Sequence, residues 1–66
     1  MSEEQETGWL IERSMNHGLE YLMADHHGLT WTTNVNAALR CARRADAEAI
    51  CLFVDDADRV AEHLWG

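Results

Sequence analysis

The chain has 66 residues, a hydrophobic fraction of 47% and a formal net charge of −7 at pH 7, with twelve acidic residues against five arginines. This charge repels the phosphates of nucleic acids and of anionic membranes, so direct DNA binding and membrane-surface binding are disfavoured. The sequence has neither the basic start of a secretory signal nor an apolar run of transmembrane length. We therefore expect a cytoplasmic protein.

A chain of this length has room for one small domain. Residues 1–7 are polar and acidic, which is typical of a disordered tail, and residues 8–66 are expected to form the domain. Cys41 and Cys51 each lie among apolar residues, where the simplest interpretation is a buried free thiol. A disulfide between them is possible but not required.

The first elements are predicted to form a β-hairpin. Residues 8–13 (GWLIER) are apolar and β-prone, and residues 19–24 alternate in polarity as a half-buried strand does. Asn16 and Gly18, between these segments, favour a tight turn. After the hairpin, Trp31 is expected to bring the chain back toward the core.

Residues 33–44 show the clearest helical pattern in the sequence. Four apolar residues repeat at the i, i+3, i+4 and i+7 spacing of one helix face: Val35, Ala38, Leu39 and Ala42. Thr33 or Asn34 can cap the start of this helix, and arginines at positions 40, 43 and 44 match the negative end of its dipole. We predict an α-helix whose arginines are solvated; contact of these arginines with nucleic acid is the less favoured interpretation.

A second helix is predicted to begin at Asp46, whose carboxylate can cap the first amides, with Glu48 in the first turn. Its apolar stripe repeats the same spacing: Ala47, Ile50, Cys51 and Val54. The alternative is a buried strand, because residues 49–54 form an unbroken apolar run that periodicity alone cannot assign. Helix is preferred because alanine and glutamate precede the run.

The last elements are a turn over residues 55–58 and a closing strand over residues 59–65, which alternate in polarity. Together the elements predict an α+β fold of the order ββααβ, with three antiparallel strands in one sheet and two helices on one face. The other face would then have no cover within the chain. Tyr21, with Trp9 or Trp65, would form an exposed aromatic patch there, of the kind used for association.

Four histidines near acidic residues suggest a metal site: His17, His26, His27 and His63. The sequence nevertheless contains no CxxC, HxxxH or HExxH spacing, and residues 55–58 do not match a calcium loop. Adjacent Glu62 and His63 would point to opposite sides of a strand, and no nucleophile motif or cofactor fingerprint is present. We predict a protein without enzymatic activity, cofactor or bound metal; a metal-dependent regulator is the weakest alternative.

The excess of carboxylates has two interpretations. DNA-binding grooves are lined with Lys and Arg, so carboxylates on a rigid scaffold can occupy such a groove as a row of phosphates would. A protein of this kind competes with DNA for its partner. The alternative is that the carboxylates only keep a small protein soluble and monomeric.

Two segments, LTWTTNVNAALRCARRADAEAI (residues 29–50) and VAEHLWG (residues 60–66), resemble small proteins of bacteriophages and prophages. The shared features are a Trp-Thr pair at Trp31, a helix of A-L-R-x-A-R type, a D-A-E helix start and an E-H-x-W end. With the small size and the acidity, the pattern resembles anti-CRISPR proteins, including type I-C inhibitors. The resemblance implies binding to the Cascade surveillance complex where that complex receives target DNA.

We therefore predict a phage-encoded, monomeric anti-CRISPR protein that acts in the bacterial cytoplasm as an acidic DNA mimic and blocks DNA entry to Cascade. The candidate partner-binding residues lie in the hairpin and around the last strand: Glu12, Glu20, Asp25, Asp55, Asp56, Asp58 and Glu62. The alternative function is a phage accessory module that binds another protein, or a second copy of itself, through the exposed aromatic sheet face.

Overall fold

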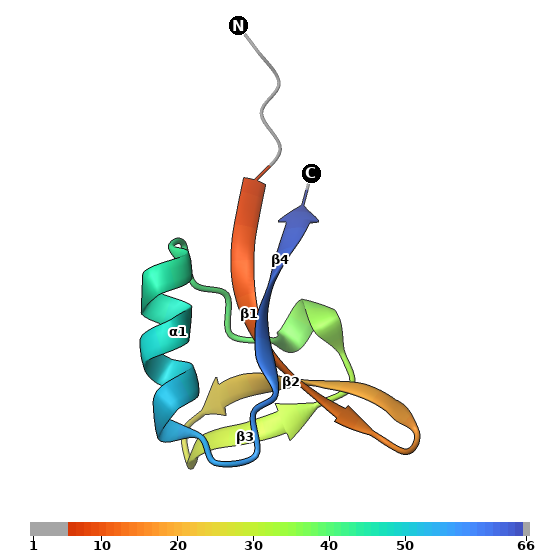
Figure 1. Ribbon diagram of the computed structural model, residues 1–66. Coiled ribbons are helices and arrows are strands. Elements are labelled where there is room, and N and C mark those ends of the chain that lie inside the picture. The colour runs from red at the N-terminus through yellow and green to blue at the C-terminus, as the bar shows by residue number, and fades with distance from the viewer. Residues whose placement is uncertain (1–5, 66) are drawn as a thin grey trace, which may run out of the picture.

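A four-stranded antiparallel sheet with the strand order β3-β2-β1-β4 forms the framework of the computed structural model, which describes residues 6–65 and the side chains of residues 7–64 (Figure 1). The elements along the chain are β1 (Glu6–Met15), β2 (Gly18–Asp25), β3 (Gly28–Thr32), the 3-10 helix η1 (Val35–Ala37), α1 (Arg44–Phe53) and β4 (Arg59–Trp65). The predicted ββααβ fold is therefore wrong. The sheet has four strands instead of three, and the described residues form one α-helix instead of two.

The inner strand β1 pairs with a different neighbour along each of its two halves. Residues 6–12 pair with β4, whereas residues 12–15 pair with β2. In Figure 1 β1 curves between these partners, so that the β2–β3 hairpin runs across the β1–β4 pair. Glu12 belongs to both ladders and lies where the two halves of the sheet meet.

The predicted hairpin is confirmed, with Met15 opposite Gly18. A second hairpin follows directly, with Asp25 opposite Gly28, and it makes β3 the strand that the sequence analysis missed. Each turn leads into a glycine with positive φ, +128° at Gly18 and +123° at Gly28. Residues with a Cβ atom rarely adopt this conformation, so both turns depend on glycine.

The hydrophobic core lies between the sheet and α1. Its buried members are Ile11, Leu22, Cys41 and Ala47. Because side chains alternate along a strand, Leu10 lies on the opposite face of β1, yet it is 0% exposed. Figure 1 shows η1 on the other side of the β1–β4 pair from α1. The face that we expected to be uncovered is therefore closed at its centre.

The two cysteines are free thiols, as predicted. Burial raises the pKa of the Cys41 thiol, and the nearby carboxylate of Asp46 adds to this rise. Cys41 is therefore protonated and unreactive at neutral pH. Cys51 is only partly buried, at the edge of the core.

The helix predicted over residues 33–44 is not formed. Within residues 33–43, helical structure is limited to the three residues of η1, where the side chain of Asn34 accepts a hydrogen bond from the N–H of Asn36. Arg44 already belongs to α1. Ala38 already has an extended backbone. Asparagine side chains that bond to nearby backbone groups favour such short turns over long helices.

The residues that follow η1 form backbone hydrogen bonds with the sheet. The N–H of Leu39 donates to the carbonyl of Leu22, at 2.9 Å, and Cys41 forms two backbone hydrogen bonds with Trp9, at 2.8 and 3.0 Å. These bonds satisfy backbone groups of β1 and β2 that have no other strand beside them. This tertiary pairing outweighs the local helix propensity of residues 38–42.

The second predicted helix is confirmed as α1, with a different start. Its N-cap is Arg43, whose side chain makes no capping bond, and Asp46 lies in the first turn. Arg44 therefore stands at the positive end of the helix dipole, opposite to its predicted place. A 2.8 Å hydrogen bond to Glu48 and a position 5.6 Å from the centre of the Trp9 ring offset this unfavourable charge.

The closing strand is confirmed as β4, paired antiparallel with β1. At the other end of the chain, β1 begins at Glu6, inside the segment of residues 1–7 that we expected to be a tail. The first five residues of that segment lie outside the described part of the chain.

Candidate interaction surface

Arg13, near the end of β1, joins two of the predicted acidic residues. Its guanidinium lies 2.6 Å from a carboxylate oxygen of Glu20 and 3.5 Å from one of Asp56, and it stacks 4.5 Å from the centre of the Trp31 ring. The Glu20 carboxylate also contacts His17 at 2.9 Å. The hydrogen bond from Arg13 is the main reason why the pKa of Glu20 is lowered, although partial burial acts in the opposite direction.

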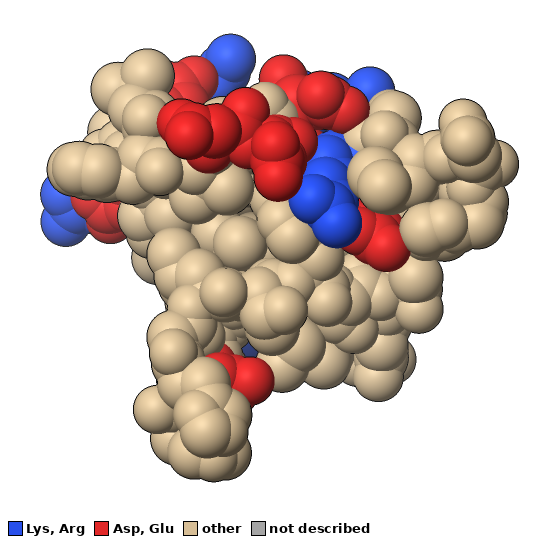
Figure 2. Space-filling view, turned by 90° about the horizontal axis from the view of Figure 1, so that it is seen from below, with Lys and Arg blue, Asp and Glu red and all other residues tan. Residues whose placement is uncertain are grey.

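Two more predicted residues lie beside this ion pair, in the turn between α1 and β4. A carboxylate oxygen of Asp58 accepts a 2.6 Å hydrogen bond from the N–H of Ser14, the residue after Arg13. Asp55 and Asp56 are exposed, with 73% of the Asp56 side chain open to solvent. We call Glu20, Asp55, Asp56 and Asp58 the acidic cluster. In Figure 2 acidic side chains gather along one edge of the molecule with an arginine among them.

Glu12 is the predicted residue that the structure removes from the surface. It is 2% exposed. One carboxylate oxygen accepts a hydrogen bond from Nε of Arg59 at 3.0 Å, and the other lies 2.7 Å from Nε2 of His63, whose ring meets Tyr21 edge-on. A buried carboxylate with both oxygens engaged is not accessible to a partner. Glu12 therefore stabilises the fold and is not part of the binding surface, contrary to the prediction.

The last two predicted residues lie apart from the acidic cluster. Asp25 is exposed in the β2–β3 turn, where its side chain accepts a 2.8 Å hydrogen bond from the N–H of His27. Glu62 lies three residues beyond the start of β4 and accepts a 2.6 Å hydrogen bond from the hydroxyl of Thr7. The structure therefore brings four of the seven candidates together and separates the other three.

Sequence reasoning missed two exposed apolar residues at the end of α1. Leu52 is 87% exposed and Phe53 is 86% exposed, and only Val54 separates them from the turn that carries Asp55 and Asp56. The sequence pattern could have predicted their exposure, because neither residue belongs to the apolar stripe predicted for the buried face of this helix. They add an apolar element beside the carboxylates.

The aromatic patch expected on the sheet is not formed by the described side chains. Trp9 packs against the core on the α1 side, and Trp31 does the same from β3. Tyr21 lies on the other face and is partly buried. The side chain of Trp65 lies outside the described part of the structure.

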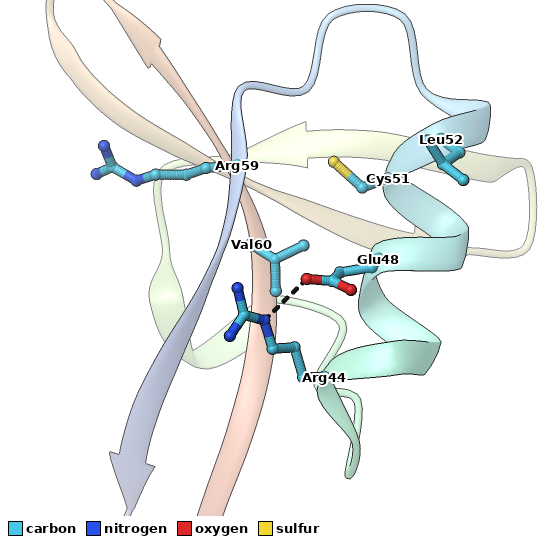
Figure 3. Close-up of a pocket in the computed structure, with 6 residues that line it drawn as sticks. All are labelled: Arg44, Glu48, Cys51, Leu52, Arg59 and Val60. Atoms are coloured by element: carbon cyan, nitrogen blue, oxygen red, sulfur yellow. Dashed lines mark hydrogen bonds and ion pairs between the residues drawn. The ribbon is translucent and has the colours of Figure 1, made fainter.

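A groove of about 460 Å³ lies between α1 and β4 (Figure 3). It is lined by Arg44, Glu48, Cys51, Leu52, Arg59 and Val60. In Figure 3 the Val60 side chain points toward α1, whereas the Arg59 side chain points away from it. The groove is bounded by charged side chains whose ion pairs are satisfied within the chain.

Within the described residues, no group of three or more His, Cys, Asp or Glu side chains is placed to hold a metal ion. No helix in residues 6–65 is both long and apolar enough to cross a membrane. Comparisons of the chain with protein-family models, with curated proteins and with solved structures gave no match.

Proposed function

We propose that this protein is a non-enzymatic inhibitor that binds a cationic, nucleic-acid-binding surface of another protein in place of nucleic acid. The observation that carries this proposal is the acidic cluster, in which carboxylates from β2 and from the α1–β4 turn meet around Arg13. Single acids spread evenly over a surface would serve solubility equally well. A local cluster is the arrangement that matches a basic groove.

Two carboxylates of the cluster, Glu20 and Asp58, are held by the fold, which favours binding. The N–H of Ser14 fixes Asp58, and Arg13 fixes Glu20 while leaving most of the Asp56 side chain exposed. Preorganised charges lose little conformational entropy on binding, and an exposed acidic surface accelerates the approach of a basic partner. Phe53 supplies an exposed apolar contact beside the charges.

The partner proposed first is the Cascade effector complex, because the sequence resembles anti-CRISPR proteins. Such a complex handles its target duplex along basic surfaces and reads the flanking motif with protein side chains, so an acidic plug there stops recognition before base pairing begins. The protein would then act in the cytoplasm of a phage-infected bacterium. The residues proposed for direct contact are the exposed Asp55, Asp56 and Asp58 of the acidic cluster, whereas Glu20 holds Arg13 in place beneath them. Asp25 and Glu62 lie outside the central contact.

The test is a competition assay in which purified type I-C Cascade binds labelled target DNA in the presence of this protein. Replacing Asp55 and Asp56 with lysine should weaken inhibition by about tenfold or more, because it reverses two charges at the proposed contact. Asp25→Lys is the matched control, since it changes an exposed charge away from the cluster and should have a much smaller effect. Inhibition that is unaffected by the double change would remove the acidic cluster as the binding site.

A further inference from the structure

We propose that two copies of this chain pair through the outer edge of β4 and form a two-fold symmetric dimer with a continuous sheet. In the described structure β4 has a strand partner on one side only. Exposed edges of this kind pair readily with another chain unless proline, a bulge or unmatched charges, above all those of lysine, block them. The seven residues of β4 include neither proline nor lysine, and the charge of Glu62 has a partner in the register argued below.

The backbone groups that point outward from β4 follow from the pairing of β1. Trp9 directs both its N–H and its carbonyl to Cys41, on the side of β1 away from β4. Its partner in β4, Glu62, is therefore in a non-hydrogen-bonded pair and directs its own N–H and carbonyl away from β1. Because backbone direction alternates along a strand, Val60 and Leu64 also direct their N–H and carbonyl groups away from β1. Three residues of β4 can therefore form backbone hydrogen bonds with a second strand.

The helix beside this edge has an unfilled face. Arg44, Glu48 and Leu52 follow one another at intervals of four residues, so they form one stripe along α1, and all three line the groove above β4. Leu52 in this stripe is 87% exposed. Filling the groove would cover Leu52 together with Val60.

In a dimer joined through β4, the two α1 helices would lie close enough to pack against each other. Because α1 packs against both β1 and β4, two helices on a joined sheet would lie about two strand spacings apart, or roughly 10 Å. This is close to the distance of about 8–10 Å at which helices pack. The two-fold axis would make the helices antiparallel, with Leu52 of each copy near Arg44 of the other.

Charge selects the register of the two strands. A two-fold axis at Glu62 would place the two Glu62 carboxylates directly opposite each other, which is unfavourable. An axis at Ala61 places Glu62 opposite Val60 of the partner copy, and Val60 lies in the groove beside Arg44. The second register therefore creates two symmetric ion pairs between Arg44 and Glu62 of the partner copy.

This dimer replaces the monomer that the net charge of the whole chain suggested. Beside the proposed seam, Arg44 offsets the charge of Glu48 and Arg59 offsets that of Glu12, so this surface is less acidic than the net charge of −7 for the whole chain suggests. The acidic cluster lies in a different part of the fold, around Arg13. The inference therefore does not depend on the proposed inhibitory function.

The first test measures molar mass by light scattering and by sedimentation over a range of protein concentrations. The wild-type chain should reach twice the monomer mass. Glu62→Arg or Arg44→Glu alone should weaken dimerisation by about tenfold or more, and the double charge swap should restore most of the loss. Arg43→Glu, an exposed arginine outside the groove, is the matched control and should leave the dimer intact.

The second test fixes the register by cross-linking in a Cys51→Ser background. Ala61 would face its own copy across the axis in a non-hydrogen-bonded pair, with Cα atoms about 4.5 Å apart, a distance that a disulfide spans. Ala61→Cys should therefore cross-link on oxidation, whereas Glu62→Cys should not. A wild-type chain that stays monomeric at every concentration, or cross-linking through Glu62→Cys instead of Ala61→Cys, would overturn the proposal.

Discussion

Glu12 belongs to both halves of the sheet through its backbone, and its side chain ties β1 to β4. Its carboxylate links Arg59 at the start of β4 with His63 near the end of that strand, although these residues lie 47 and 51 positions away in sequence. The position of Glu12 in a β-prone segment gave no sign of these partners. Only the fold reveals that this acidic residue is buried, and so sequence reasoning placed it wrongly on the binding surface.

Replacing Glu12 with alanine should lower the free energy of unfolding by about 2–3 kcal/mol, because it removes the charge-assisted hydrogen bonds of Glu12 with Arg59 and with His63. The partly buried ring of His63 would also lose its carboxylate partner. Urea denaturation measures the loss. Asp55→Ala, an exposed carboxylate in the turn before β4, is the control and should change stability by no more than about 0.5 kcal/mol. Equal losses in the two variants would show that the Glu12 contacts contribute nothing specific.

Glu20 should make the stability of the protein sensitive to acid. Its pKa is lowered in the folded state, chiefly by the hydrogen bond from Arg13, so its contribution is fully present above the unfolded pKa of about 4.5. That contribution is lost as the pH falls through the lower, folded pKa. Melting temperatures of the wild type and of Glu20→Gln should therefore differ at neutral pH and converge in strong acid. A difference that stays constant with pH would contradict this assignment.

At the scale of elements, the segment that connects β3 to α1 shows where local patterns mislead. Residues 33–44 carry a regular helical stripe, yet Leu39 and Cys41 complete backbone pairing with β2 and β1 instead. The second helical pattern formed as predicted, because Ala47 and its neighbours on the stripe meet a core that spans the sheet. Periodicity thus identified apolar residues correctly in both segments, but it could not tell which backbone groups the sheet would need.

The two hairpin turns give an element-scale prediction. Gly18→Ala and Gly28→Ala should each lower the free energy of unfolding by about 1 kcal/mol, because alanine disfavours positive φ. Apart from the residues directly before and after it in the chain, neither glycine has a heavy atom within 4 Å of its Cβ position, so the cost is conformational and not a clash with the rest of the fold. D-alanine, introduced by chemical synthesis, adopts positive φ readily and should retain or raise stability. A loss with D-alanine equal to that with L-alanine would refute this explanation.

At the scale of the whole molecule, charge composition predicted an acidic surface but not its shape. The turn before β4 was recognised from the run of aspartates, and Asp55, Asp56 and Asp58 do share one region with Glu20. Their meeting point at Arg13 and Ser14 depends on the curvature of β1, which no local pattern encodes. The exposed edge of β4 likewise follows from strand order, which the sequence did not reveal.

The central claim is that the acidic cluster takes the place of nucleic acid phosphates on a basic protein surface. The most direct measurement is the Kd for type I-C Cascade as a function of salt concentration, for the wild type and for the variant with lysine at positions 55 and 56. We predict that log Kd of the wild type rises steadily with log salt concentration and that the variant binds more weakly with a smaller slope. A Kd that is independent of salt, or the same in both proteins, would contradict the claim.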